Sequence, residues 1–98
     1  MLHGNNDSVK VQLLNQMALE INPKDADKAR SYAIQGGELS DSINYQRGKS
    51  ESLYLIGLSY SKTDKQMALR YLKDALSTAE KIGYKSLTSK CLNAIGNA

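Results

Sequence analysis

The stretch Leu53-Tyr54-Leu55-Ile56-Gly57 recurs further along the chain as Leu92-Asn93-Ala94-Ile95-Gly96. Both copies read Leu-x-x-Ile-Gly, and they begin at positions 53 and 92, which are 39 residues apart. The same step backwards leads to Leu14-Asn15-Gln16-Met17-Ala18, a weaker third copy in which alanine replaces glycine. Sequence periods of roughly 20 to 50 residues are typical of solenoids and other repeat arrays. This spacing therefore guides the interpretation of the rest of the chain.

The composition is that of one small globular domain. Of the 98 residues, 41% are hydrophobic and 23% are charged, which argues against wholesale disorder. Charge is uneven: six basic and seven acidic residues up to Tyr60 give −1, and seven basic and three acidic residues from Ser61 give +4. We interpret the basic half as solvated helix faces, with an acidic partner or nucleic acid as alternatives. Nucleic acid is the weakest alternative, because no basic stretch alternates with aromatic residues that could stack on bases.

Residues that could support catalysis or bind a metal are few. Cys91 is the single cysteine and His3 the single histidine, which excludes an internal disulfide and a multi-cysteine zinc site. Gly36-Gly37 does not resemble a phosphate-binding loop, because no strand precedes it and no Lys-Ser/Thr pair follows. We interpret Cys91, which is in register with Ser52, as a small buried residue and not as a nucleophile. We therefore expect no catalytic residues, no cofactor and no metal site, and we do not expect an enzyme.

No targeting or membrane segment is recognisable. No apolar run approaches the roughly 18 to 20 residues of a membrane-spanning helix, so we expect no membrane segment in this chain. Residues 1–8 are polar and lack the hydrophobic segment of a signal peptide. We expect a cytoplasmic protein, with a periplasmic sensor region that has lost its signal peptide as the alternative.

The first helix is predicted from apolar residues that recur at three- and four-residue steps. Asn22-Pro23 ends it, since the residue before proline avoids the α conformation. The same pair can open the next helix, with Asn22 as its N-cap and Pro23 at the first helical position. One repeat later, Ser61 is again a capping residue and is followed three positions on by Asp64. The apolar positions of the first helix are Val11, Leu14, Met17, Ala18 and Ile21.

The second helix of each repeat keeps the same register, and its small residues allow a neighbouring helix to approach closely. We expect a weak point or a kink at Gly36-Gly37, because each glycine costs about 1 kcal/mol relative to alanine in a helix. Gly83 predicts a helix end in the left-handed conformation, and Asn44 is its equivalent one repeat earlier. The matching positions are Ala29 with Ala68, Tyr32 with Tyr71, and Gly36 with Ala75.

These signals predict an all-α chain and no strands, because sustained period-two alternation and Asn-Gly or Asp-Gly hairpin turns are missing. A flexible lead-in of residues 1–8, which includes His3, precedes the helices. The architecture we expect is an α-solenoid of antiparallel helix pairs stacked side by side. The five predicted helices cover residues 8–21, 23–43, 47–61, 63–82 and 86–97.

The pattern resembles tetratricopeptide repeats. In that family the first helix carries a large apolar residue, an apolar-Gly/Ala pair and an aromatic residue, and Leu53, Ile56-Gly57 and Tyr60 match these places. The resemblance spans residues 9–98 as two repeats, 12–50 and 51–89, plus the first helix of a third. The repeat is longer than usual for the family, and this variety resembles arrays in bacterial signalling proteins such as sensor histidine kinases. The places of the second helix are occupied by Ala68, Leu72 and Ala75 and by Ala29, Ala33 and Gly36.

The resemblance implies a superhelix whose concave face is lined by the first helices and contacts an extended or helical peptide. The family's clamp for C-terminal carboxylates is not reproduced at Asn15, because Val11 stands one turn before it. The concave-face residues that the resemblance implies for partner binding are Gln12, Asn15, Leu19, Glu51, Tyr54, Leu58, Lys90, Asn93 and Asn97.

We therefore expect a protein–protein interaction module, a scaffold that binds a peptide or a neighbouring domain as the sensory or regulatory part of a larger bacterial signalling protein. The alternative is a structural segment that forms homo-oligomers through its unpaired last helix, where Leu87, Leu92 and Ile95 form an apolar side. In either case Gly57 and Gly96 are predicted to lie where a first helix meets a second helix too closely for a larger side chain.

Overall fold

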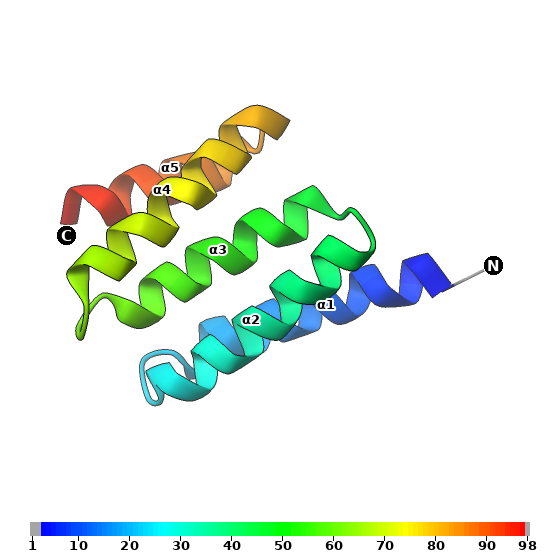
Figure 1. Cartoon of the computed structure of the whole chain (residues 1–98), viewed down its shortest axis with the longest axis horizontal. Helices are drawn as coiled ribbons and strands as arrows, with labels where there is room; N and C mark the ends of the chain where they lie inside the picture. The colour runs from blue at the N-terminus through cyan, green and yellow to red at the C-terminus, as the bar shows by residue number, and fades with distance from the viewer. Residues whose placement is uncertain (1–2, 98) are drawn as a thin grey trace.

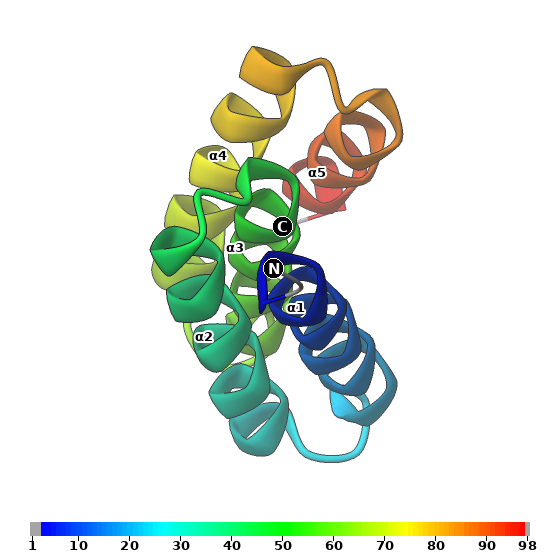
Figure 2. The same ribbon diagram turned by 90° about the vertical axis from the view of Figure 1, so that its right-hand side faces the viewer.

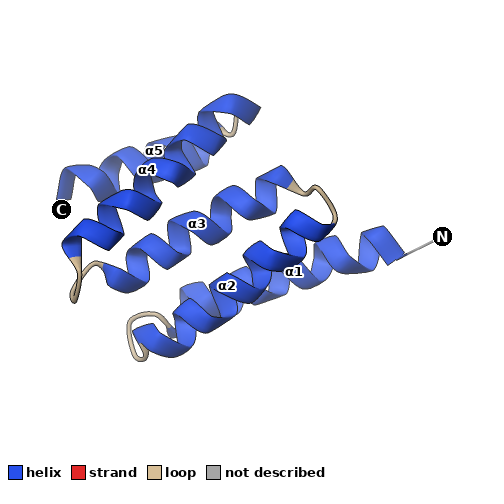
Figure 3. Ribbon diagram, in the orientation of Figure 1, coloured by secondary structure: helices blue, strands red, loops and turns tan. Residues whose placement is uncertain are grey.

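The computed structural model describes residues 3–97, with side chains from Asp7 to Gly96, and all regular structure in this range is helical (Figures 1 and 3). The all-α prediction with five helices is confirmed, and residues 3–97 contain no strand. None of the described helices has the length and apolar character needed to cross a membrane. The helices are α1 (His3–Ile21), α2 (Ala26–Ser42), α3 (Gln46–Tyr60), α4 (Lys65–Ile82) and α5 (Lys85–Asn97).

Successive helices run in opposite directions and pack on one another along the chain (Figure 1). In addition, α1 contacts α3, and α3 contacts α5. Viewed from the end, α3 lies in the middle, with α2 and α4 on one side and α1 and α5 on the other (Figure 2). Helix α3 therefore touches all four other helices, and the odd-numbered helices share one face of the molecule.

Two aspartates one repeat apart begin the second helices. Asp25 is the N-cap of α2, and its side chain accepts a hydrogen bond from the Lys28 amide at 3.0 Å. Asp64 caps α4 in the same way, with the Met67 amide at 3.1 Å. The predicted caps at Asn22 and Ser61 are therefore wrong, and α2 begins three residues after Pro23. A carboxylate that reaches the third amide of the helix satisfies an otherwise unpaired donor, so the helix starts at the aspartate in both repeats.

The ends of the second helices agree with the prediction. Gly83 has φ 73° and Asn44 has φ 57°, so both adopt the left-handed conformation that glycine and asparagine tolerate best. The amide of the following tyrosine then returns to a helix carbonyl, from Tyr45 to Ser40 at 2.9 Å and from Tyr84 to Ala79 at 2.8 Å. These bonds are those of a glycine-type helix end. The repeat step is therefore present in the turns as well as in the sequence.

Helix α1 begins at His3, five residues before the predicted start. Residues 3–8, predicted as part of a flexible lead-in, are helical, and Met1 and Leu2 lie outside the described residues. Asp7 and Ser8 are only partly exposed. Extending an existing helix adds one backbone hydrogen bond for each residue that is fixed, so weak helix formers such as Gly4 can continue it.

The glycine pair of α2 is a site of close packing and does not interrupt the helix. Helix α2 passes through Gly36 and Gly37 without a break, and both residues are buried. A Cβ atom at Gly36 would lie 2.7 Å from Asn15 Oδ1 and 3.2 Å from Ser52 Oγ. The missing side chain therefore makes room for polar groups that come from α1 and α3.

The Leu-x-x-Ile-Gly motif behaves differently in its two copies. A Cβ atom at Gly57 would lie 2.9 Å from Leu72 Cγ and 3.2 Å from the Ala68 carbonyl oxygen, so the predicted close approach of α3 and α4 is confirmed there. No atom lies within 4 Å of the corresponding point at Gly96, and the prediction for Gly96 is wrong. Among the described residues no second helix follows α5, so its motif has no partner to pack against.

Two small-residue clusters form the core. The first joins α1, α2 and α3, and the second joins α4 and α5, with apolar rings and chains of α3 packed against both. Alanine predominates because helices with small facing side chains can pack closely. The buried members are Ala18, Ala29, Ala33, Leu55 and Ile56 in the first cluster and Ala75, Ala79, Leu87 and Cys91 in the second.

Candidate functional site

A groove of about 690 Å³ lies between α1, α3 and α5, on the face that the odd-numbered helices share. We call it the central groove. Both apolar and polar side chains line it, which is the usual make-up of a site that binds a ligand or a peptide. Its lining residues are Gln12, Asn15, Gln16, Leu19, Tyr45, Arg47, Glu51, Tyr54, Leu55, Tyr84, Leu87 and Lys90.

Six of the nine residues predicted for partner binding line this groove: Gln12, Asn15, Leu19, Glu51, Tyr54 and Lys90. Two others, Leu58 and Asn93, line a second groove of about 450 Å³ formed by α3, α4 and α5. Tyr54 and Lys90 line both grooves, which are therefore adjacent. The side chain of the ninth residue, Asn97, lies outside the described part of the chain.

Tyr54 forms the wall between the two grooves. Its ring packs against both core clusters, so it is held from two sides. Burial raises the pKa of its hydroxyl above the usual 10.0, and the nearby Cys91 acts in the same direction. Within the described residues this hydroxyl makes no hydrogen bond with the protein. A ligand in either groove therefore meets a neutral phenol that can still donate a hydrogen bond.

Asn15, in contrast, has its polar atoms engaged inside the protein. The residue is 5% exposed, its amide nitrogen donates to the Gly48 carbonyl at 3.2 Å, and its Oδ1 accepts from Ser52 Oγ at 3.0 Å. It thereby joins α1 to α3 at the floor of the central groove. The sequence interpretation placed Asn15 on the binding face. The small residues Gly36, Gly48 and Ser52 around it are the signal that could have shown a buried amide instead.

Two tyrosines that the sequence interpretation did not assign to the site edge the groove. Tyr45 Oη accepts a hydrogen bond from Gln12 Nε2 at 3.0 Å. Tyr84 Oη donates to Glu51 Oε2 at 2.5 Å. Gln12 and Glu51 are one repeat apart, as are Tyr45 and Tyr84, so the two bonds are equivalent. The signal was present in the helix-end pattern, where both tyrosines follow the left-handed residue.

The Tyr84 ring also carries a cation. The Arg47 guanidinium lies over it, 4.3 Å from the ring centroid. Burial and then the hydrogen bond with Glu51 raise the pKa of Tyr84, while Arg47 acts in the opposite direction. The arrangement is a small cluster in which a positive and a negative group share one neutral phenol. A third hollow of about 480 Å³ lies beside it, where the start of α3 meets the α4–α5 turn and Lys85.

No cluster of three or more His, Cys, Asp or Glu side chains that could hold a metal occurs in the described residues. Cys91 is buried, and burial raises the pKa of its thiol to about 11. At neutral pH this thiol is protonated and is a poor nucleophile. The groove therefore offers hydrogen bonds, charge and apolar contact.

The chain matches no protein family model, no curated protein and no solved structure.

Proposed function

We propose that this chain is a protein-interaction module that binds a peptide or a neighbouring domain in the central groove. The supporting observation is that six residues chosen from the repeat pattern, from Gln12 on α1 to Lys90 on α5, line one groove. The repeated turns, the two aspartate caps and the close approach at Gly57 support an α-solenoid similar to tetratricopeptide repeats. The repeat of 39 residues resembles the longer repeats of arrays in bacterial signalling proteins, and this resemblance supports a role within a larger protein of that kind.

The groove has the properties that a peptide site needs. Leu19 is 46% exposed, and together with Leu55 and the Tyr54 ring it gives an apolar floor against which side chains can be buried. Lys90, and the side-chain oxygen of Gln16, whose nitrogen donates to Glu20 at 2.9 Å, can bond to a peptide backbone or to polar side chains. Apolar anchors surrounded by polar groups are the usual arrangement of sites that recognise peptides.

The experiment is a selection of binders from a random peptide library, followed by calorimetry on the wild-type chain and two variants. Leu19→Ala removes an exposed apolar contact in the groove, and it should weaken the selected peptides by about tenfold. Ile34→Ala is the matched control, because Ile34 is 42% exposed on α2 and lines neither groove. If no peptide is enriched, or if both variants bind as the wild type does, the proposed function is wrong.

Self-association is a second candidate function, but the exposed apolar side chains favour α1 over the predicted last helix as its contact surface. On α5, Leu92 is 54% exposed, whereas Leu87 is buried and Ile95 is only partly exposed, so the predicted apolar side of the last helix is narrower than expected. A wider apolar row lies on α1, where three large side chains recur every four residues. These are Val9, Leu13 and Met17, which are 52%, 58% and 43% exposed.

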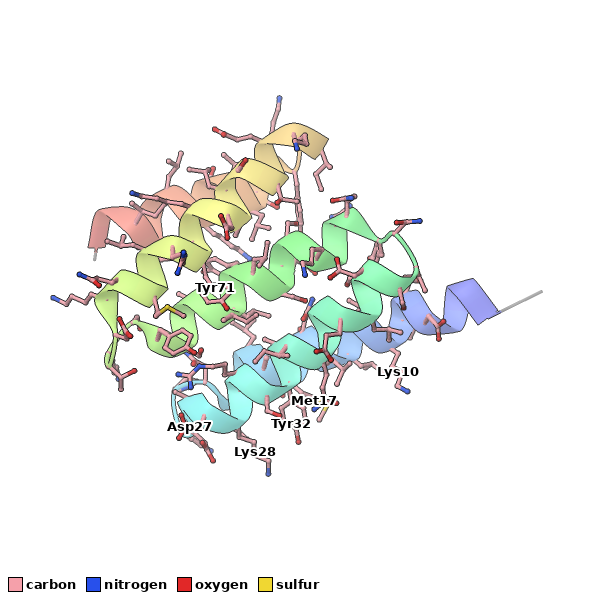
Figure 4. The ribbon with its side chains drawn as sticks, in the orientation of Figure 1. Lys10, Met17, Asp27, Lys28, Tyr32 and Tyr71 are labelled. Carbon is pink, nitrogen blue, oxygen red and sulfur yellow. The ribbon has the colours of Figure 1, made fainter. Side chains whose placement is uncertain are left out.

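The α1 row is equivalent by the repeat step to Gly48, Ser52 and Ile56 of α3, which are buried. The Met17 side chain points away from α3, toward the same side as Tyr32 of α2 (Figure 4). Multi-angle light scattering distinguishes the two candidates. A concentration-dependent dimer that Leu13→Glu converts to a monomer would support self-association, whereas a monomer at all concentrations would exclude it.

A further inference from the structure

The charged side chains around the grooves are mostly basic. The central groove is lined by Arg47, Lys90 and one carboxylate, Glu51. Lys65 and Lys90 line the second groove, and Arg47 and Lys85 line the hollow beside the α4–α5 turn. Neither of the latter two has an acidic residue in its described lining. Around the three hollows, four cations therefore face a single carboxylate.

That carboxylate is already engaged. Glu51 accepts the hydrogen bond from Tyr84, and Arg47 lies over the same ring, so these opposite charges belong to one cluster. Lys90 and Lys65 make no ion pair and no hydrogen bond within the described residues. Lys90 occupies the position one repeat after Glu51 and two repeats after Gln12. Unlike Gln12 and Glu51, it makes no hydrogen bond to a tyrosine within the described residues. The positive charge between the two grooves is therefore not neutralised by the protein.

Apart from Glu20, whose carboxylate accepts a hydrogen bond from the groove residue Gln16, the acidic residues with a partner in the described part of the chain lie outside the lining of the second groove and the α4–α5 hollow. Asp25 and Asp64 cap helices at the turns, Asp27 pairs with Arg30 within α2, and Asp41 of α2 pairs with Lys49 of α3. The sequence of α5, from Lys85 to Asn97, contains two lysines and no acidic residue. Unpaired cations in a groove with low-dielectric walls attract negatively charged partners and increase their rate of association.

We infer that the partner of these grooves is an acidic peptide segment whose Asp or Glu side chains contact Lys90 and Lys65. This inference rests on the proposed function and specifies the chemistry of its partner. An apolar residue of the same segment packs beside Leu19 or Leu58, on either side of the Tyr54 ring. The carboxylates belong to side chains within the segment, and a free chain terminus is not required.

A polypeptide fits better than a nucleic acid. Binding of single strands depends on open aromatic faces on which bases stack. Here Arg47 covers the Tyr84 ring, the Tyr54 ring packs against both core clusters, and a ring carbon of Tyr45 lies against Gly48. The walls that remain include the leucine side chains at positions 19, 55 and 58, which suit the apolar side chains of a peptide.

The test is the sequence composition of peptides selected from a random 12-residue library displayed without a free C-terminus. We expect the enriched sequences to contain more Asp and Glu than Lys and Arg. A synthetic, C-terminally amidated representative should lose about tenfold in affinity on Lys90→Glu. Its binding should weaken when salt rises from about 0.05 M to about 0.5 M, because exposed charges are screened. Lys73→Glu is the matched control, since Lys73 is exposed on α4 and lines none of the three hollows.

The possible failures differ from one another. Neutral or basic sequences that still lose affinity on Leu19→Ala would overturn the inference and leave the proposed function in place. Enrichment that Leu19→Ala and Lys90→Glu both leave unchanged, or no enrichment at all, would overturn both. A random 20-residue DNA oligonucleotide is the last arm. If it binds more tightly than the acidic peptides and loses binding on Lys90→Glu, the partner is a nucleic acid and the inference is wrong.

Discussion

The hydroxyl of Tyr84 donates a hydrogen bond to the carboxylate of Glu51 at 2.5 Å, and this pair repeats, one step along the chain, the bond between Gln12 and Tyr45. In each case the residue after a helix-ending turn holds the preceding odd-numbered helix at the edge of the central groove. The pairs differ in charge, because a carboxylate replaces an amide. The contribution of a charged and of a neutral hydrogen bond to stability can therefore be compared at equivalent positions of one molecule.

Removing these hydroxyls should therefore have unequal effects. Tyr84→Phe leaves the Glu51 carboxylate without its donor, and hydrogen bonds to charged groups contribute about 1.5 to 3 kcal/mol. Because the pair is only part-buried, we expect a loss of about 1 to 2 kcal/mol in the free energy of unfolding. Tyr45→Phe removes an exposed bond between neutral groups and should cost about 0.5 kcal/mol. Urea unfolding of both variants measures this, and equal losses would contradict it.

The two motif glycines make a second matched pair. In a solvent-exposed helix, Gly→Ala stabilises by up to about 1 kcal/mol. Gly57→Ala should instead destabilise by about 1 to 3 kcal/mol, because the new methyl group meets Leu72 and the Ala68 carbonyl. Gly96→Ala meets no atom within 4 Å and should be neutral or slightly stabilising. Thermal unfolding of both variants would test the contrast, and a Gly57→Ala variant more stable than the wild type would refute the close approach.

Asn15 and Asn93 occupy equivalent positions in the repeat but have different surroundings. Asn15→Ala removes both bonds of a buried amide and leaves the Gly48 carbonyl and the Ser52 hydroxyl with fewer partners, which should cost about 2 to 3 kcal/mol. Asn93 is exposed, so Asn93→Ala should change stability by less than about 0.5 kcal/mol. Chemical denaturation distinguishes the two, and a similar small effect at both positions would show that Asn15 is not a structural residue.

Alkaline pH should weaken the fold. Burial raises the pKa of Cys91 from 9.0 to about 11, and the pKa values of Tyr54 and Tyr84 are also raised. A group whose pKa is higher in the folded state contributes stability that is complete below its unfolded pKa and is lost as the pH rises through the folded pKa. The cysteine contribution should therefore disappear between pH 9 and about 11.

The measurement is the urea midpoint of the wild type and of Cys91→Ala across this pH range. The variant should lose less stability than the wild type, because the thiol no longer contributes. In the wild type, the thiol should react slowly with a thiol reagent at neutral pH and rapidly once urea unfolds the chain. Fast labelling of the native protein would show that Cys91 is not buried.

Local signals in the sequence were reliable where the chain makes its own turns. Asn44 and Gly83 were predicted from residue type alone, because the left-handed conformation is costly for most other residues. The helix starts were less certain. Asn22 and Asp25 are both good N-caps, and local propensity does not decide which side chain reaches the third amide of the helix.

Which residues line the groove depends on contacts between distant parts of the chain, and no local sequence pattern predicts these contacts. The repeat step placed Tyr54 and Lys90 on one face, and both line the central groove. It also placed Asn15 there. The side-chain amide of Asn15 is instead buried against Gly36 and Ser52, which lie 21 and 37 residues further along the chain. Equivalent positions share a direction on their helices but not the side chains that surround them. For the same reason, the repeat alone could not show that Gly96 lies in open space.

The central position of α3 also determines where the molecule opens first. Most contacts join helices that are neighbours in the chain, so little loop-closure entropy opposes folding, and such topologies fold rapidly. Within the described residues, α1 and α5 pack less extensively than α2, α3 and α4, so opening can start from either of them. The amide hydrogens of α3, such as those of Leu55 and Ile56, should therefore exchange with solvent last, and exchange should be faster in α1 and α5.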